Sequence, residues 1–265
     1  MKITLDLRKS IPENAQEYYE GAKKAKRKIP GLVEALERSG RELEELSLSG
    51  AAEVETQVLE KRRARAWFEK FRWFYSSEGF LVIGGRDATT NDILVKKHLE
   101  ADDVVFHADI QGAPFFIVKN PDGVEVPENT LREAAAAAAS YSRAWKNGWA
   151  SCNVYYVSPE QVSKSPPAGE YLPKGAFMIY GEKKWFKNTP VEVAVGFQDV
   201  EPHVIGGPKS AVKVRAIAYS VVVPGDEKAG VLSKRIAKAF KEKGCEEFSL
   251  NDIQYFIPGG EGKLS

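Results

Sequence analysis

Residues 67–120 read WFEKFRWFYSSEGFLVIGGRDATTNDILVKKHLEADDVVFHADIQGAPFFIVKN and contain apolar runs at 80–83, 104–109 and 115–119. A double glycine follows the first run, and the apolar residues after it have helical spacing. Strand, glycine turn, helix and strand in this order aim backbone N–H groups at an anion, although ordinary α/β topology gives the same order without a ligand. The pattern predicts the fold and leaves the function open.

Short motifs along the chain resemble, in the same order, those of one known domain. They are Trp67-Phe68-Glu69-Lys70-Phe71 with Trp73-Phe74, Gly84-Gly85-Arg86-Asp87, Asn91, His107-Ala108-Asp109, Gly112-Ala113, Lys119-Asn120, Ser142-Arg143-Ala144-Trp145, Gln161-Val162-Ser163-Lys164, Gly169-Glu170-Tyr171-Leu172 and Gly175-Ala176-Phe177-Met178-Ile179. Over about residues 67–187 the chain resembles the NFACT-R domain of the ribosome-quality-control NFACT family, archaeal type. That family comprises the nuclear export mediator factor and its archaeal and bacterial, fibronectin-binding-protein-A-like relatives. The chain departs from the family pattern at Ala88-Thr89-Thr90, where glutamines are usual, and around Gln111 and Pro114.

Composition excludes several classes of protein. The 265 residues carry a formal net charge of +1, so any nucleic-acid binding must come from local basic patches. No apolar run approaches the roughly 20 residues of a membrane span, and we expect a cytoplasmic protein without a membrane partner. Cys152 and Cys245 form no CxxC pair, so we expect reduced thiols and no zinc site. No cofactor is indicated.

We predict an α+β fold in three parts. Residues 1–78 are expected to hold an N-terminal strand and an antiparallel helical hairpin, residues 79–198 a mixed-sheet domain, and residues 199–265 further strands and a basic helix. The resemblance identifies the hairpin with the coiled-coil middle region of the family and residues 79–198 with its NFACT-R domain. It also implies that the tRNA-binding N-terminal half of the family is absent from this chain.

Local signals place individual elements. Apolar spacing predicts that the second hairpin helix runs to about Tyr75, and that the first is irregular near Pro30, because proline removes a helical hydrogen bond. Residues 130–133 form a capping box that opens an alanine-rich helix. A strand at residues 212–218 and a helix at residues 229–241 are expected in the last part of the chain.

Arg86 and Asp87 follow the double glycine and have two interpretations. The glycines would let the backbone approach a phosphate or ribose, with the Arg86 guanidinium as a two-pronged donor and Asn91 beside the turn. Alternatively, the glycines make a tight turn and Asp87 caps the next helix, which is the commoner use of such a residue. The sequence is neither a P-loop nor a GxGxxG fingerprint.

His107 and Asp109 are two apart in a predicted strand, so both side chains are expected on one face. They are interpreted as a structural polar pair or as contacts to an RNA base or 2′-hydroxyl, with His107 neutral. The rival interpretation is a metal-dependent nuclease or hydrolase that uses Asp87, His107 and Asp109. A third metal ligand would have to be Asp87, His98 or a distant group, and no HExxH, carboxylate cluster or GxSxG is present. We therefore expect no catalytic residues.

Two basic runs lie on the predicted hairpin, at residues 23–28 and 61–65. A turn between residues 39 and 50 brings them within a few helical turns of each other. The acidic residues that would pair with them are displaced toward residues 34–45, so phosphate binding is favoured slightly over a solvated face. The candidate contacts on the hairpin are Lys23, Lys24, Arg27, Arg62 and Arg63.

Further candidate RNA contacts lie in the domain that follows. Lys119 and Lys164 are candidate phosphate ligands. The aromatic residues between 67 and 74 are too many to face solvent and are expected mostly in the core. Tyr171 and Trp185, in predicted loops beside lysines, are candidates for stacking on bases.

The resemblance implies the RNA-binding module of a ribosome-associated quality-control factor, which docks on the large ribosomal subunit or its tRNA during rescue of stalled translation. Its partners would be rRNA or tRNA and the N-terminal half of the family. The residues themselves support binding of a polyanion through basic faces. A third interpretation is a scaffold whose hairpin grips a ribosomal protein, with salt-insensitive binding and no affinity for naked RNA.

Overall fold

The structure, a computed structural model, describes residues 66–165, 172–246 and 248–265, together with scattered positions between 10 and 37. The chain divides into two compact units, residues 1–64 and 65–265. The described positions between 11 and 37 are helical. The expected N-terminal strand and second hairpin helix lie outside the described residues up to position 65, so the hairpin stays a prediction, as do the domain boundaries at 78 and 198.

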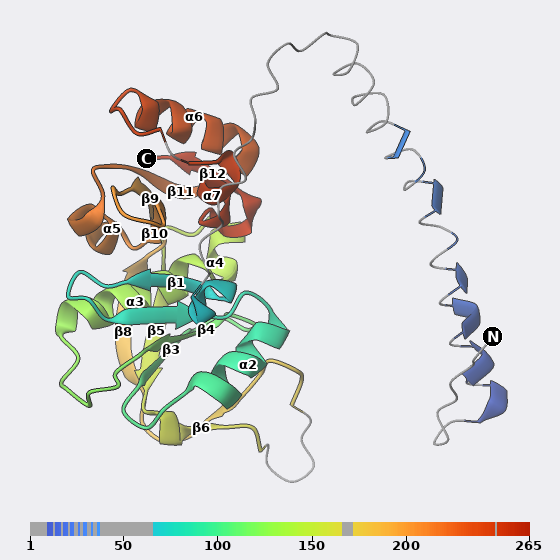
Figure 1. Cartoon of the computed structure of the whole chain (residues 1–265). Coiled ribbons are helices and arrows are strands. Elements are labelled where there is room, and N and C mark those ends of the chain that lie inside the picture. Colours follow the sequence, from blue (N-terminus) through green and yellow to red (C-terminus); the bar gives the residue numbers. More distant parts are fainter. Residues whose placement is uncertain are drawn as a thin grey trace. The chain divides into compact units, whose positions relative to one another are not determined.

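The second unit is built on a six-stranded sheet with the order β1-β2-β4-β3-β5-β8 (Figure 1). The strands are β1 (Arg72–Tyr75), β2 (Leu81–Gly84), β3 (Val104–Ala108), β4 (Phe115–Val118), β5 (Ser151–Val157) and β8 (Lys184–Pro190). Each neighbouring pair is antiparallel. The prediction of a mixed sheet is therefore wrong, because short links such as those from β1 to β2 and from β3 to β4 reverse the direction of the chain.

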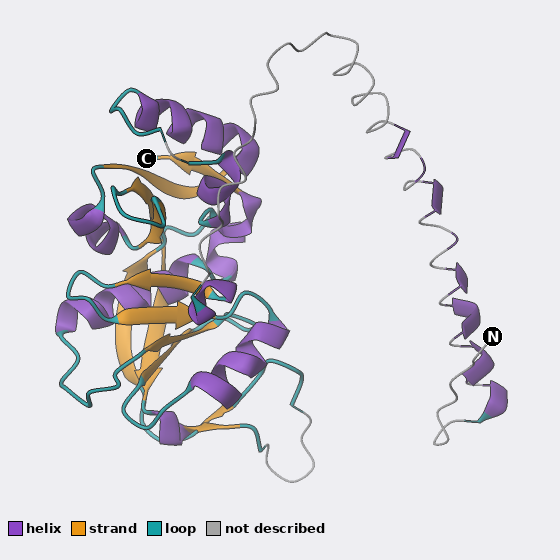
Figure 2. Cartoon of the chain, viewed as in Figure 1, coloured by secondary structure: helices purple, strands orange, loops and turns teal. Residues whose placement is uncertain are grey.

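Helices cover both faces of this sheet (Figure 2). The alanine-rich helix α3 (Glu128–Ser140) packs on one face, where Phe106 and Phe116 are fully buried. Helix α2 (Ala88–His98) buries Leu94 on the other face, against Ile83 and Ile117. Alanine side chains let α3 approach the sheet closely, while neighbouring strand residues alternate between the two cores.

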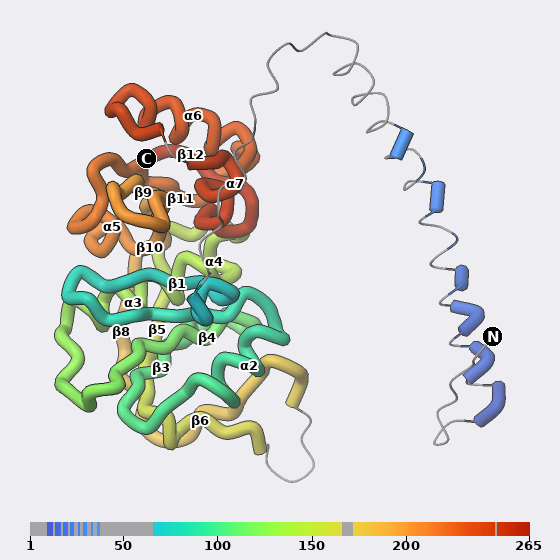
Figure 3. The backbone as a smooth tube through the Cα atoms, viewed as in Figure 1, coloured from blue at the N-terminus to red at the C-terminus, as the bar shows by residue number. Residues whose placement is uncertain are grey.

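A second, four-stranded antiparallel sheet has the order β10-β9-β11-β12 and belongs to the orange and red part of the chain in Figure 3. Its strands are β9 (Val193–Phe197), β10 (Val204–Gly207), β11 (Ala218–Lys228) and β12 (Glu261–Leu264), and its helices are α5 (Lys209–Arg215), α6 (Ala229–Lys241) and α7 (Leu250–Tyr255). Leu232 and Ile236 of α6 lie in the same hydrophobic core as the α3 alanines. The two sheets therefore share one core.

Short elements complete the unit. They are β6 (Val162–Ser163), β7 (Met178–Ile179), the helix α4 (Arg143–Lys146), and the 3-10 helices η1 (Trp67–Lys70), η2 (Pro159–Gln161) and η3 (Pro258–Gly260). None of the helices that the structure describes is long and apolar enough to cross a bilayer.

The predicted end of the second hairpin helix is wrong, because residues 72–75 form strand β1. Trp73 packs with Ile83 in one core and Phe74 with Phe116 in the other. An aromatic run that is buried on both faces shows no polar alternation, so its pattern does not distinguish a strand from a helix. Pairing of β1 with β2 decides the outcome.

Two other element predictions are corrected. The expected strand at residues 212–218 begins instead in helix α5, which starts after Pro208 and buries Ala211 and Val212. The alanine-rich helix begins at Glu128, so the expected capping box lies inside it. Its Thr130 hydroxyl donates to Glu78 at 2.5 Å, and its Glu133 carboxylate accepts from the backbone N–H of Ser77 at 2.8 Å. These side chains hold the β1–β2 turn instead of capping the helix.

Candidate functional site

The glycine turn between β2 and α2 is required by close packing. A Cβ on Gly84 would lie 2.4 Å from the ring of Phe116, and one on Gly85 would lie 1.7 Å from Oδ1 of Asn91. Asn91 is buried, and its Oδ1 accepts a hydrogen bond from the backbone N–H of Phe115 at 3.3 Å. The glycines and Asn91 therefore join α2 to the sheet.

Asp87 is the N-cap of α2. Its Oδ1 accepts from the backbone N–H of Thr90 at 2.8 Å, and this bond holds the pKa of Asp87 below its ordinary value. The Thr90 hydroxyl oxygen in turn accepts from the backbone N–H groups of Arg86 and Asp87, at 2.8 and 2.9 Å. The backbone N–H groups of Arg86 and Asp87 are therefore already bonded to Thr90 and do not face a phosphate.

The Arg86 side chain belongs to a group that we call the arginine–tyrosine cluster, made of Arg72, Arg86, Tyr141 and Tyr255. The Arg72 guanidinium lies 4.1 Å from the centre of the Tyr141 ring, and that of Arg86 lies 4.6 Å from the centre of the Tyr255 ring. Burial lowers the pKa of Arg72, and the nearby charge of Arg86 lowers it further. Neither guanidinium forms an ion pair with a carboxylate of the described residues.

The two tyrosines are fixed by their hydroxyl groups. Tyr141 donates to the carbonyl oxygen of Phe256 at 2.9 Å, and burial raises its pKa to about 12. Tyr255 donates to the carbonyl oxygen of Phe71 at 2.6 Å. Both rings therefore present fixed faces to the guanidinium groups. The charge of Arg86 acts on Arg72, and no carboxylate of the described residues pairs with either, so an external anion would relieve their repulsion and accept hydrogen bonds from their N–H groups.

Arg86 was identified from the sequence, whereas Arg72 was not, because residues 67–75 were assigned to a helix. A cation inside the aromatic run Phe71-Arg72-Trp73-Phe74-Tyr75 was the available signal. In a strand it places Arg72 opposite Gly84, next to the turn that carries Arg86.

His107 is held inside the sheet between Phe115 and Tyr155. Its Nε2 lies 3.1 Å from the carbonyl oxygen of Ala113 and must donate, because a carbonyl only accepts. Its Nδ1, 3.4 Å from the Tyr155 hydroxyl, is then the acceptor. Burial lowers the pKa of His107, so the ring is neutral at pH 7. Asp109 lies just beyond the end of β3 and is exposed.

Lys119 forms an ion pair in the interior. Its Nζ lies 2.5 Å from Asp103 Oδ2, 3.0 Å from Glu100 Oε2 and 2.7 Å from the carbonyl oxygen of His98. The Asp103 side chain is fully buried and that of Lys119 is 10% exposed. An ammonium group has three protons, and each has an acceptor here, so Lys119 keeps no donor for a phosphate.

The ammonium group of Lys164 is also bonded within the protein. Its Nζ lies 2.9 Å from Asp92 Oδ1 and 3.1 Å from the carbonyl oxygen of Ala176. Asp92 also accepts from the backbone N–H of Gly175 at 2.9 Å and pairs with Lys96 at 3.1 Å. These bonds fasten α2 to the chain before β7, which gives Lys164 a structural task.

Stability should therefore depend on pH through Asp92. Its hydrogen bond with Lys164 contributes most to a pKa of about 2, against an ordinary 3.8. A carboxyl group whose pKa is lower in the folded state stabilises the fold above its ordinary pKa and loses that contribution as pH falls toward 2. We expect Asp92→Asn to be less stable than the wild type at pH 6 and to approach it by about pH 2. Urea unfolding of both proteins across this range measures the difference, and a constant gap would contradict the expectation.

Strand β8, the edge of the six-stranded sheet that lies opposite β1, carries an exposed aromatic ring among lysines. Trp185 lies in β8, not in a loop as predicted, and is 43% exposed, with its ring centre 5.3 Å from that of Tyr155. Lys183 Nζ lies 4.2 Å from the centre of the Tyr155 ring. Lysines on an edge strand also prevent pairing with other sheets. Trp185 on this edge is a candidate for stacking on a base. The other stacking candidate, Tyr171, lies outside the described part of the chain, as do residues 24, 27, 62 and 63 of the hairpin.

The residues proposed for metal chemistry do not converge. Among the described residues, no group of three or more His, Cys, Asp or Glu side chains is arranged to hold a metal ion. Asp87 caps α2, His107 Nε2 is bonded to Ala113, and His98 stacks on Trp67 with ring centres 4.5 Å apart. The exposed Lys23 is the one hairpin candidate that the structure describes.

Comparison with known proteins identifies the family of this chain. Residues 70–181 match the model of the NFACT protein RNA binding domain, and residues 1–63 match that of the NFACT N-terminal and middle domains. The chain belongs to the NFACT family. The match to the RNA binding domain of NFACT proteins includes Arg72, Arg86 and Tyr141, whereas Tyr255 and Trp185 lie beyond it.

Several NFACT relatives are similar in sequence. The archaeal Rqc2 homolog aRqcH of Methanocaldococcus jannaschii is 41% identical over 98% of this chain and 39% of that protein. The ribosome quality control complex subunit NEMF homolog of Drosophila melanogaster is 43% identical over 69% of this chain and 18% of that protein. The human ribosome quality control complex subunit NEMF is 41% identical over 69% and 17%, respectively. The chain thus spans well under half the length of these relatives.

A solved structure gives a looser match. The C-terminal part of the fibronectin/fibrinogen-binding protein from Streptococcus suis matches with a TM-score of 0.41 and 19% identity, covering 79% of this chain and 81% of that one.

Proposed function

We propose that this chain is the RNA-binding part of a ribosome quality-control factor in the cytoplasm, and that it docks on the large ribosomal subunit or on its tRNA during rescue of stalled translation. Membership of the NFACT family and the names of its relatives support this proposal. In the molecule itself, the observation that carries it is the arginine–tyrosine cluster.

The cluster has the chemistry of a phosphate site. Arg86 is exposed and offers its N–H groups to solvent, while Arg72 is half-buried and close enough to feel the charge of Arg86, with its own positive charge unopposed by a described carboxylate. A guanidinium presents parallel N–H donors that match two phosphate oxygens. Because both groups rest on fixed tyrosine rings, little side-chain entropy is lost when they bind. We infer that the cluster holds one RNA phosphate at a defined position.

The hairpin has a different task in this proposal. Lys23, Lys24, Arg27, Arg62 and Arg63 carry charges on long, flexible stems, which suit phosphates anywhere along a backbone. The cluster then provides position and the hairpin provides general affinity. Lys119, Lys164 and His107 act through the fold, and Asp87 through its helix cap, because their polar atoms already have internal partners. Asn91 acts through the fold by way of its Oδ1, which accepts from the backbone N–H of Phe115.

Replacing Lys24, Arg27, Arg62 and Arg63 together with alanine should weaken binding to all RNA sequences alike. It should also flatten the salt dependence by about 0.7 to 0.9 log units for each phosphate that the variant no longer binds. The measurement is a salt titration of binding to ribosomal RNA and to random RNA by the wild type and the variant.

Three outcomes would contradict the proposal in whole or in part. Binding to ribosomes that is insensitive to salt, with no affinity for naked RNA, would favour the protein scaffold. Metal-stimulated cleavage of RNA by the purified chain, abolished by His107→Ala or Asp109→Ala, would favour the nuclease. An unchanged salt dependence in the hairpin variant would remove the hairpin from the RNA interface.

A further inference from the structure

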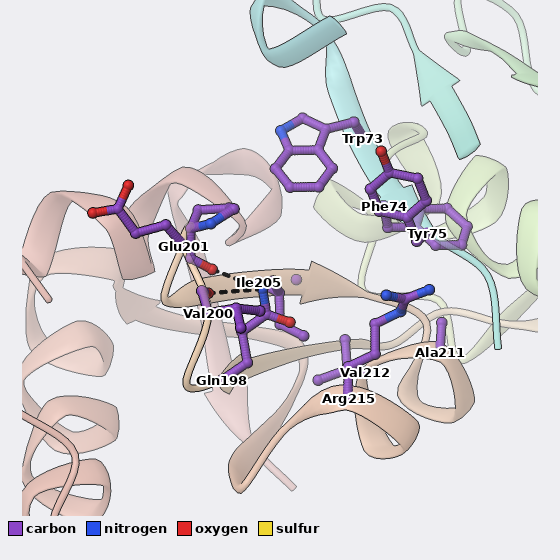
Figure 4. A pocket seen from close by; sticks show the side chains of 12 residues that line it. Trp73, Phe74, Tyr75, Gln198, Val200, Glu201, Ile205, Ala211, Val212 and Arg215 are labelled. Atoms are coloured by element: carbon purple, nitrogen blue, oxygen red, sulfur yellow. Dashed lines mark hydrogen bonds between the residues drawn. The ribbon is translucent and has the colours of Figure 1, made fainter. Parts of the chain in front are cut away.

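A cleft of about 190 Å³ lies between β1 of the first sheet and β10 and α5 of the second (Figure 4). Aromatic residues Trp73, Phe74 and Tyr75 of β1 line one side, and Ile205 and Val212 line another. Sites for cofactors and drug-sized ligands occupy roughly 300–1,000 Å³. This cleft is smaller and has the size of a single ring system.

Gln198 brings an unused hydrogen-bond acceptor to the cleft. The residue is only 9% exposed, and its Nε2 donates to the carbonyl oxygens of Val200 and Pro202, at 3.1 and 2.9 Å. Two carbonyl partners identify this amide atom as the nitrogen and fix the side chain. Its Oε1 points away from that loop, toward Val212 and Arg215 (Figure 4), and has no hydrogen-bond partner among the residues described. This oxygen is open to solvent in the cleft, so it can accept a hydrogen bond from a ligand that presents an N–H group.

Arg215 brings a cation to the same cleft. Its guanidinium lies 5.2 Å from the centre of the Tyr75 ring and forms no ion pair within the described part of the chain. Helix α5 also carries the exposed Lys209 and Lys213 and no acid. Glu201 lines the cleft as well, but its carboxylate points away from it (Figure 4). The charge at the α5 side therefore suits an anionic group beside the ring.

We propose that the cleft binds one unpaired RNA base. The base lies among the aromatic side chains of β1, one of its N–H groups donates to Gln198 Oε1, and the adjoining phosphate contacts Arg215. Unpaired bases are commonly recognised by stacking on aromatic side chains and by hydrogen bonds to their edges. Every RNA base has an N–H group on its pairing edge, and that group is occupied when the base is paired. The cleft would therefore select unpaired bases over paired ones without distinguishing among the four bases.

This inference rests on the proposed RNA binding and specifies a single-stranded segment as the ligand. Strand β1 joins the two sites, since Arg72 of the arginine–tyrosine cluster and Phe74 of the cleft lie two residues apart and so share one face of the strand. A phosphate on the cluster and a base in the cleft would therefore come from one stretch of RNA. A tryptophan side chain from a protein would also donate an N–H to Gln198, but it would leave Arg215 without an anion, so the base is favoured.

The test compares a short single-stranded RNA with the same ribose–phosphate backbone lacking its bases. Fluorescence anisotropy should show that the wild type prefers the RNA with bases by about 5- to 150-fold, the range for stacking of one base. Ala211 lines the cleft, so the larger side chain of Ala211→Leu should reduce that preference at least several-fold and leave affinity for the abasic backbone unchanged. Ala211 is 2% exposed, so thermal unfolding must show that the variant folds.

A surface pair serves where Ala211→Leu does not fold. Arg215→Ala and Lys213→Ala remove the same charge from the same helix, and only Arg215 lines the cleft. We expect Arg215→Ala to weaken binding of the RNA with bases several-fold more than Lys213→Ala does. Trp185 is kept in all variants, so a base preference that survives in folded Ala211→Leu belongs elsewhere and overturns the inference, as does an equal loss of binding in Arg215→Ala and Lys213→Ala.

The remaining outcomes are also decisive. Equal binding of the two backbones by the wild type overturns the base cleft and leaves the proposed RNA binding intact. No binding of either backbone overturns both. Saturable binding of N-acetyl-tryptophanamide, abolished in Ala211→Leu, together with no base preference, identifies the cleft as a protein contact instead.

Discussion

Arg86→Gln is expected to weaken binding to ribosomal RNA by about 5- to 150-fold, the cost of one specific charged contact of 1–3 kcal/mol. Arg72→Gln is expected to have an effect in the same range, because both guanidinium groups face one phosphate in our proposal. Arg86→Lys keeps the charge but loses the parallel donors, so it should recover only part of the affinity. Filter binding or anisotropy at fixed salt measures these effects.

Arg132→Gln is the matched control. Arg132 is an exposed arginine of α3 whose guanidinium lies 3.0 Å from Glu128, so it already has a carboxylate partner. It should change RNA affinity little. Random RNA should lose less than ribosomal RNA in the Arg86 variant, since hairpin contacts remain. If Arg86→Gln and Arg132→Gln behave alike, the cluster is not the phosphate site. Arg72 is half-buried, so its variant is interpreted only if its unfolding midpoint is near that of the wild type.

Lys119→Ala should cost about 3–5 kcal/mol of unfolding free energy, because it leaves the fully buried Asp103 carboxylate without its cation. Urea unfolding measures this loss. RNA affinity of the folded protein should stay unchanged, since all three ammonium protons already have internal acceptors. Lys119 would then be a structural residue despite its place among the motifs of an RNA-binding domain.

Two controls separate the effect of the Lys119–Asp103 ion pair from the effect of removing any positive charge. Lys97→Ala removes an exposed lysine of α2 and should change stability by no more than about 0.5 kcal/mol. The double variant Lys119→Met with Asp103→Asn removes both charges and should be less destabilised than Lys119→Ala. A variant of Lys119 that is as stable as the wild type but binds RNA poorly would reverse the assignment.

Local sequence signals predicted many elements correctly. The apolar runs at residues 80–83, 104–109 and 115–119 correspond to β2, β3 and β4, and the segment after Asp87 is helix α2. The hydrophobic periodicity of a strand or helix, and a helix cap that involves a residue three positions away, are both visible in a short stretch of sequence. The order of the motifs was enough to identify the NFACT family, which the comparisons confirm.

The use of each polar side chain was decided by tertiary structure. Lys119 pairs with an acid 16 positions away and Lys164 with one 72 positions away, while Tyr255 hydrogen-bonds to a carbonyl 184 positions away. Motif membership could not show that Lys119 and Lys164 are already bonded, nor that the charges of Arg72 and Arg86 interact while neither pairs with a carboxylate of the described residues. Strand β1 was missed for the same reason, since its partner β2 and the cores on both its faces come from other segments. Hydrogen bonds and ion pairs form between atoms that are close in space, and for Lys119, Lys164 and Tyr255 those atoms are far apart along the chain.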